Sequence, residues 1–223
     1  MSTIQTINLS FVNCYLLKNE DRYILVDTGV PGMYTTLEKS LQDAGCIPGK
    51  LGLIILTHGD IDHAGNAAYL KTKYNTKVAI RKEDAPMVEK KELLMQRKVK
   101  SVVMRMMQSI MNFLGSYKKM TAAFQSFTPD LYLEDGQELK TYGFDAKILH
   151  LPGHTPGSIA VLFENGDIIA GDTLQNMRKP NTAQIIDNET VFAESIERLK
   201  QLSLKTVYPG HGKPFPWQSF LKK

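Results

Sequence analysis

An apolar run that leads into a cluster of histidines and aspartates constrains this chain more than any other feature. Residues 53–56 read Leu-Ile-Ile-Leu, a pattern typical of a strand that is buried on both faces. The next seven residues, 57–63, read Thr-His-Gly-Asp-Ile-Asp-His. Neutral imidazoles and carboxylates are good ligands for zinc and other first-row metals. The run therefore predicts a metal site where a buried strand ends, with these candidate ligands: His58, Asp60, Asp62 and His63.

Three more candidate ligands lie far downstream, each beside a glycine. His154 lies in Pro-Gly-His-Thr-Pro-Gly, Asp172 follows Ala-Gly, and His211 lies in Pro-Gly-His-Gly. Of only five histidines in the chain, four stand next to or near glycine at predicted strand ends. Glycine allows a backbone to approach its neighbours closely. We therefore expect the downstream ligands to reach the same cavity as the first cluster.

Strand and helix signals alternate along the chain. Each half has strands first and a helix later, and no low-complexity linker separates the halves. We predict one domain of α/β (α+β) class that spans residues 1–223. The predicted strands are 4–9, 12–17, 23–26, 53–56, 77–80, 146–151, 158–163, 167–170 and 206–208, and the predicted helices are 31–44, 66–74 and 189–202.

An insertion over about residues 83–127 differs from the remainder in composition. It carries seven of the ten methionines, and residues 81–119 have a net charge of +6, whereas the whole chain has +4. Apolar residues recur every three or four positions from Val99 to Phe113, which predicts an amphipathic helix. Three roles are open for this predicted helix: it packs on the core, it attaches to a membrane surface, or it forms a lid over the active site. The lid would present these side chains to a substrate: Met106, Met107, Ile110 and Met111.

The sequence has no secretory signal and no apolar run of the roughly 20 residues that a membrane span needs. Its two cysteines, Cys14 and Cys46, form no disulfide or metal-ligand pattern and are predicted to be buried. These features predict a cytoplasmic protein. They say nothing about its oligomeric state.

Six segments together resemble the metallo-β-lactamase superfamily. They are residues 13–17, 25–29, 57–63, 151–158, 171–173 and 209–212. The resemblance implies a four-layer αββα sandwich, in which two sheets pack face to face with helices outside. The first motif of the family is His-x-His-x-Asp-His, and this chain has Asp60 in place of the second histidine.

The resemblance also implies how the ligands divide. One metal ion would take His58, Asp60 and His154, and the other would take Asp62, His63 and His211, with Asp172 as the bridge. Asp60 has the alternative of lining the pocket without touching metal. Two divalent ions are expected, with zinc favoured and manganese or iron as alternatives, because aspartate is a harder ligand than imidazole.

Two polar residues near these motifs receive other expectations. Asp27 would orient a ligand or the ligand loop from behind, or else serve as a turn residue or helix cap. The fifth histidine, His150, is expected to be a hydrogen-bonded residue near a sheet edge.

The implied reaction is hydrolysis of an ester, thioester or lactone by a metal-bound hydroxide, with Asp62 as the catalytic residue that orients the nucleophile or takes its proton. Motifs similar to those of glyoxalase II-like and lactonase-like hydrolases favour such a small-molecule substrate. Two alternatives stay open. A phosphodiesterase acting on a nucleotide or RNA would use the basic insertion, although few aromatics accompany it. A non-enzymatic, metal-stabilised binding module would bind a partner through the same helix.

Overall fold

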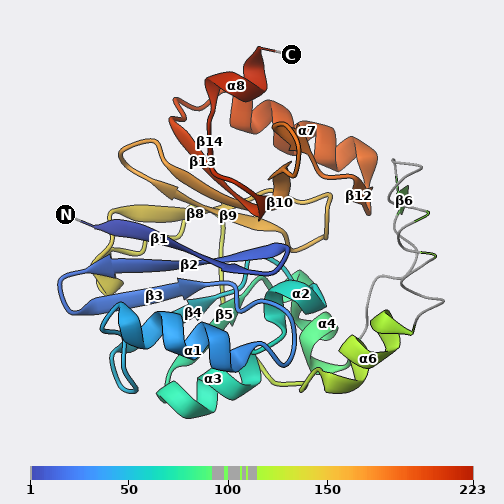
Figure 1. Cartoon of the computed structure of the whole chain (residues 1–223). Helices are drawn as coiled ribbons and strands as arrows, with labels where there is room; N and C mark the ends of the chain where they lie inside the picture. Colours follow the sequence, from blue (N-terminus) through green and yellow to red (C-terminus); the bar gives the residue numbers. More distant parts are fainter. Residues whose placement is uncertain (1, 92–97, 100–105, 107–108, 110–114, 223) are drawn as a thin grey trace.

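The computed structural model describes residues 2–91, 98–99, 106, 109 and 115–222 (Figure 1). Two large sheets form its centre. The first has the order β1-β2-β3-β4-β5-β7, with antiparallel pairing among β1 to β3 and parallel pairing from β3 to β7. Its strands are β1 (Thr3–Leu9), β2 (Val12–Asn19), β3 (Arg22–Val26), β4 (Leu51–Ile55), β5 (Lys77–Ile80) and β7 (Leu131–Tyr132).

The second sheet has the order β14-β13-β10-β9-β8, and β11 adds to β10. In it β10 and β13 run parallel, whereas the other pairs are antiparallel. Its strands are β8 (Ala146–His150), β9 (Ile159–Phe163), β10 (Ile168–Asn176), β11 (Asn181–Thr182), β13 (Thr206–Gly212) and β14 (Phe215–Pro216).

The sheets pack face to face because their strands are apolar on both sides. In β2, Tyr15 and Leu17 belong to the core between the sheets, whereas Cys14 and Leu16 face the core under the helices. The same alternation recurs in β9, where Val161 faces the first sheet and Ala160 faces outward. Side chains of a strand alternate between its two faces, so each sheet feeds two apolar layers. The predicted αββα arrangement is confirmed.

Helices cover both outer faces (Figure 1). The outer helix of the second sheet, α7, begins where Asn188 accepts hydrogen bonds from the N–H groups of Thr190 and Val191, and it buries Phe192 and Leu199. Within the described residues, no helix has the length and apolar character needed to cross a membrane. The helices are α1 (Tyr34–Asp43), α2 (Ile61–Ala64), α3 (Ala67–Tyr74), α4 (Ala85–Glu89), α6 (Ser116–Ala123), α7 (Glu189–Lys200) and α8 (Gln218–Leu221), with 3-10 turns η1 (Lys82–Asp84) and η2 (Lys140–Tyr142).

Two strands of the second sheet continue well beyond their predicted ends. The prediction ended them at residues 170 and 208, but β10 runs to Asn176 and β13 to Gly212. The two extensions pair with each other, Gln175 opposite His211, after register shifts on both sides of Gly171. The apolar pattern stops where this pairing begins, because the extensions carry polar site residues. Asp172 and His211 therefore lie in strands rather than in loops.

The predicted insertion lies partly outside the described residues. The predicted helix would include Val99, but Lys98–Val99 form a two-residue strand, β6, which pairs with β12 (Ile185–Ile186). Of the predicted lid residues, Met106 lies in a helix and is 62% exposed. The other three, Met107, Ile110 and Met111, lie outside the described residues, so the lid remains a prediction.

Candidate metal centre

The structure brings all seven candidate ligands together at one end of the two sheets. His58 and Asp60 follow β4, Asp62 and His63 lie in α2, and His154 lies between β8 and β9. From the second sheet, β10 contributes Asp172 and β13 contributes His211. Their ligand atoms form three groups, each within 4.8 Å: His58–Asp60–His154, Asp62–His63–His211 and His58–His63–Asp172. The first two groups contain the same residues as the two predicted half-sites, and Asp172 lies in the third group with one histidine from each.

Distances within each half-site suit a small cation. Asp60 Oδ2 lies 3.4 Å from His58 Nε2 and 3.2 Å from His154 Nε2. In the other half-site, Asp62 Oδ2 lies 3.5 Å from His211 Nε2 and 3.9 Å from His63 Nε2. Ligand atoms roughly 3.3–3.5 Å apart are what a tetrahedral ion with bonds of about 2.0–2.1 Å requires.

Asp172 lies between the two half-sites. Its Oδ2 is 3.1 Å from His211 Nε2 and 3.7 Å from His154 Nε2, and its Oδ1 is 3.3 Å from His63 Nε2. One carboxylate therefore faces histidines of both groups, as a bridging ligand must.

Every candidate histidine is anchored through its other ring nitrogen. Nδ1 of His154 donates to the carbonyl of Ile185 at 2.7 Å, and Nδ1 of His211 donates to the carbonyl of Phe11 at 2.8 Å. A carbonyl oxygen only accepts, so each Nδ1 carries the proton and each Nε2 presents a lone pair to the cluster.

Asp27 orients the two remaining histidines, one directly and the other through Thr57. Its Oδ2 accepts from His63 Nδ1 and from Thr57 Oγ1, both at 2.8 Å, and its Oδ1 accepts from the N–H of Thr57 at 2.8 Å. Because the Thr57 hydroxyl gives its hydrogen to Asp27, its oxygen accepts from His58 Nδ1 at 2.9 Å. Asp27 has a φ of +62°, an uncommon backbone conformation for a residue other than glycine. Asp27 therefore contacts one candidate ligand, His63, directly and also holds Thr57, the residue before His58.

The donor set fits a metal pair. His58 Nε2, His63 Nε2 and Asp172 Oδ1 are buried and lack a hydrogen-bond partner among the described residues. Buried polar atoms are almost always satisfied, and three unpartnered atoms facing one point are what a bound cation would satisfy.

Charges within the cluster shift its titrations strongly. Burial alone would lower the pKa of His211, but the Asp172 and Asp62 carboxylates raise that pKa to about 9. His63 is also buried, and Asp172, Asp27 and Asp62 raise its pKa well above its ordinary value. Burial works to raise the pKa of Asp172, yet His211 and His63 hold it well below its usual range. When no cation is bound, protons on these histidines therefore balance the negative charge of the carboxylates.

We expect metal affinity to fall as the pH is lowered below about 9. Protons and metal compete for the same Nε2 atoms, so apparent affinity should change roughly tenfold per pH unit for each proton displaced. Competition of Zn²⁺ against a chelator at several pH values measures this slope. His150→Gln is the matched control, because His150 bonds the carbonyl of Pro156 and belongs to none of the three groups. A pH-independent affinity would contradict the proton competition.

The segment that carries His211 is fixed by two buried side chains of β2. Nδ2 of Asn13 donates to the carbonyls of Gly212 at 2.7 Å and Pro209 at 3.0 Å, and the hydroxyl of Tyr15 donates to Pro209 at 2.6 Å. Residues 13–17 form one of the six segments on which the family resemblance rests, but the sequence alone indicates no function for them. Their side chains bind backbone about 200 residues away, which no local pattern reveals.

Sequence reasoning also missed Asp84, which it assigned to the insertion. Asp84 is fully buried, and its Oδ2 accepts from the Gly59 N–H at 2.9 Å and from Thr155 Oγ1 at 2.7 Å. Its Oδ1 accepts from the Gly157 N–H at 2.7 Å. One carboxylate thus joins the loop of His58 to the loop of His154. The local sequence pattern is an aspartate two residues before Pro86, at the start of a helix. That pattern predicts a helix cap and gives no sign of a link between two loops.

We expect Asp84→Asn to weaken both folding and metal binding. An amide would turn its NH₂ group toward at least one of the three donors, and a buried donor left unsatisfied costs about 1–3 kcal/mol. The free energy of unfolding should fall by about that amount, measured with denaturant, and metal affinity should fall with it. Asp21→Asn, in an exposed ion pair with Lys50, is the control. Equal effects of the two substitutions would contradict this role.

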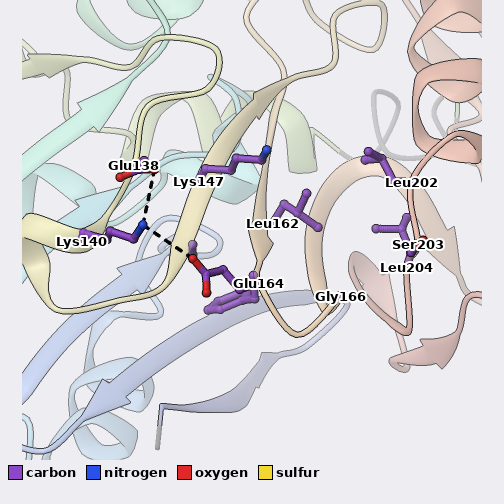
Figure 2. A pocket seen from close by; sticks show the side chains of 11 residues that line it. Glu138, Lys140, Lys147, Leu162, Glu164, Gly166, Leu202, Ser203 and Leu204 are labelled. Atoms are coloured by element: carbon purple, nitrogen blue, oxygen red, sulfur yellow. Dashed lines mark ion pairs between the residues drawn. The ribbon is translucent and has the colours of Figure 1, made fainter.

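A separate hollow of about 320 Å³ lies at the start of β8 (Figure 2). Lys140 forms ion pairs there with Glu138 at 3.6 Å and Glu164 at 3.7 Å, and Lys147 lines the same hollow. None of the seven candidate ligands lines it. His154 follows the opposite end of β8, so this hollow is remote from the cluster.

The two-sheet fold and the paired His/Asp groups define a class of metal-dependent hydrolases. The sequence profile of the metallo-beta-lactamase superfamily matches residues 7–211. The chain therefore belongs to this superfamily and is a hydrolase of it.

Three curated relatives illustrate the range of similarity. The probable metallo-hydrolase YflN of Bacillus subtilis is 24% identical over 242 residues, covering 98% of this chain and 85% of YflN. An N-acyl homoserine lactonase of Bacillus sp. is 26% identical, covering 89% of this chain and 80% of the lactonase. The hydroxyacylglutathione hydrolase GloC of Haemophilus influenzae is 28% identical over 166 residues, covering 73% of this chain and 66% of GloC. The match thus spans just under two thirds of GloC.

Solved structures agree with the fold. The metallo-beta-lactamase family protein TTHA1429 from Thermus thermophilus superposes with a TM-score of 0.74 at 24% identity, over 99% of this chain and 77% of that protein. TTHA1623, solved in a di-iron-bound form, gives a TM-score of 0.69 at 25% identity, over 96% of this chain and 94% of that protein.

Proposed function

We propose that this chain hydrolyses an acyl ester, thioester or lactone at two divalent metal ions held by the seven-residue cluster. The observation that carries the proposal is the convergence of four histidine Nε2 atoms on three carboxylates, each histidine oriented by a hydrogen bond at Nδ1. His58, Asp60 and His154 would hold one ion, Asp62, His63 and His211 the other, and Asp172 would bridge them.

When bound, the ions would supply Lewis acidity, which lowers the pKa of water and polarises an acyl carbonyl. The chain's own residues orient the reactants. Asp62 is 23% exposed, and its carboxylate borders solvent, so it can orient the attacking water and accept its proton. Water adds to the acyl carbon, the bond from that carbon to oxygen or sulfur breaks, and the products are a carboxylate and an alcohol or thiol.

Relatives support the acyl substrate class. The lactonase and the hydroxyacylglutathione hydrolase carry names that denote hydrolysis of a lactone and of a glutathione thioester. Support for two ions comes from TTHA1623, which binds two irons.

Asp60 would give its half-site a carboxylate where the family motif has a histidine, so that each half-site has two imidazoles and one carboxylate. Two divalent ions carry +4, and Asp60, Asp62 and Asp172 carry −3, which leaves +1; histidine at position 60 would leave +2. Aspartate is the harder ligand, so manganese or iron gains affinity relative to zinc.

We expect Asp60→His to raise the affinity ratio of zinc to manganese by about tenfold. Competition titrations, with metal analysis after purification without added metal, measure the ratio. Asp60→Asn removes the charge without adding an imidazole and separates the two effects. One equivalent of metal or less, unchanged in Asp60→His, would contradict a binuclear site with Asp60 as ligand.

An assay panel tests the function. Phenyl acetate, an acyl thioester, a lactone and bis(p-nitrophenyl) phosphate are compared with zinc, with manganese and after metal removal. We expect metal-dependent acyl hydrolysis. Faster phosphodiester cleavage would favour the phosphodiesterase alternative that the basic insertion suggests. If no substrate is hydrolysed in a metal-dependent way, the non-enzymatic binding module is the alternative that remains.

A further inference from the structure

A second hollow, of about 520 Å³, is lined by Phe11, which contacts His211, and by Gly212, which follows His211 in the chain. Three segments surround it: the turn after β1, the end of β10 and the end of β13. Its lining includes the side chains of Phe11, Asn176, Met177, Arg178 and Lys213.

His211, one of the candidate ligands, contacts the lining of this hollow through Phe11. The carbonyl of Phe11 accepts from His211 Nδ1 at 2.8 Å, and the Phe11 ring stacks on the His211 ring at 5.9 Å with an interplanar angle of 10°. On its other edge, His211 Nε2 lies 3.1 Å from Asp172. Asn176, also in the lining, joins the ends of β10 and β13, because its Nδ2 donates to the carbonyl of Lys213 at 2.8 Å. A molecule seated in the hollow would therefore lie next to the half-site of Asp62, His63 and His211.

The lining has a definite chemistry. Phe11 and Met177 are apolar yet 41% and 61% exposed. Arg178 and Lys213 contribute two positive charges, and no carboxylate lines the hollow. Within the described part of the chain, neither cation forms an ion pair. An apolar wall beside two such cations suits an organic anion.

We propose that this hollow binds a carboxylate-bearing part of the substrate while the acyl carbonyl lies at the metal cluster. The substrate class is thus narrowed to acyl esters or thioesters with an anionic end. This rests on the hydrolase function proposed above. The metal cluster itself has three aspartates that offset most of the ions' charge, so recognition of an anion depends on Arg178 and Lys213.

Two matched probe series test the proposal: S-acetyl mercaptoalkanoic acids of increasing chain length, and the corresponding amides, which lack only the negative charge. The quantity measured is the ratio of kcat/KM for acid to that for amide, with the metal-loaded full chain. Arg178→Gln and Lys213→Gln should each lower this ratio by about 3- to 10-fold, through KM, because surface charge pairs contribute modestly. High salt should shrink the effect.

Lys147→Gln is the matched control, because it removes one exposed positive charge in the remote hollow of Figure 2. It should leave the ratio at the value of the parent protein. If Arg178→Gln and Lys213→Gln also leave the ratio unchanged while the amides are hydrolysed, the anion site is wrong and the hydrolase function stands.

If neither probe series is hydrolysed, thioester hydrolysis is ruled out, and the assay panel above decides ester and lactone hydrolysis separately. Binding measurements then decide whether the hollow is an anion site. N-acetyl amino acids of matched length and their amides are then titrated and followed by NMR. A preference for the carboxylate that is lost in the double variant Arg178→Gln/Lys213→Gln supports the site. No preference, or one that survives in the double variant, overturns it.

Discussion

Asp172→Asn is expected to lower kcat/KM by more than about 100-fold and to reduce bound metal below two equivalents. Asp172 faces His63, His154 and His211 with its two carboxylate oxygens. An amide offers only one oxygen and no charge, so it cannot bridge. Loss of even an outer partner of a metal ligand costs roughly 10- to 100-fold, and loss of a bridging ligand should exceed that.

The measurements for this substitution are metal content by elemental analysis and kinetics on an acyl thioester. Asp167→Asn is the control, because Asp167 lies just before β10 and its side chain bonds only the nearby Asn165 among the interactions described. A variant at position 172 that retains two equivalents of metal and the kcat/KM of the parent protein would rule out the bridge.

Gly210→Ala is also expected to disrupt the cluster while leaving the sheets intact. A Cβ at position 210 would collide with Asp172 Oδ1 and lie 2.8 Å from Cε1 of His63. Real Cβ atoms essentially never approach other atoms so closely, so both ligands must move. A displacement of about 1 Å at an active site can reduce a rate by about 100-fold.

Gly52→Ala provides the comparison for this substitution. Its added Cβ would meet nothing closer than the Tyr23 carbonyl at 3.4 Å, and neither glycine has a positive φ. We expect metal affinity and turnover to fall at least tenfold in Gly210→Ala, with far-UV circular dichroism unchanged. Parent-like metal affinity in Gly210→Ala would show that the backbone there has room to adjust.

Much of the sandwich could be predicted because its signals are local. Strands such as β2 and β9 are apolar on both faces, and α7 begins at a capping asparagine and keeps one apolar side. The extensions of β10 and β13 could not be predicted, because their polar residues are held by strand pairing, between β10 and β13 and between β10 and β11, and not by an apolar pattern. The short β6–β12 pair is also nonlocal, and it replaced the start of a predicted helix.

In the candidate site, too, some residues could be predicted from the sequence and others could not. His58, Asp60, Asp62 and His63 were recognisable because a strand end and a glycine accompany them in one short run. The roles of Asp84 and Phe11 were not recognisable. Asp84 acts through Thr155, 71 residues away, and Phe11 through His211, 200 residues away.

The sequence by itself determined which ligands the chain offers, and the order of apolar segments that stacks two sheets with helices outside. Both are written in short-range patterns of residue type. Only the tertiary structure decided how each imidazole is oriented, which carboxylate joins the two ligand loops, and what adjoins the cluster at His211. The physical reason is that a hydrogen bond to an imidazole Nδ1 or a loop N–H depends on where distant backbone lies after the sheets have packed. Spacing along the chain carries no record of that position.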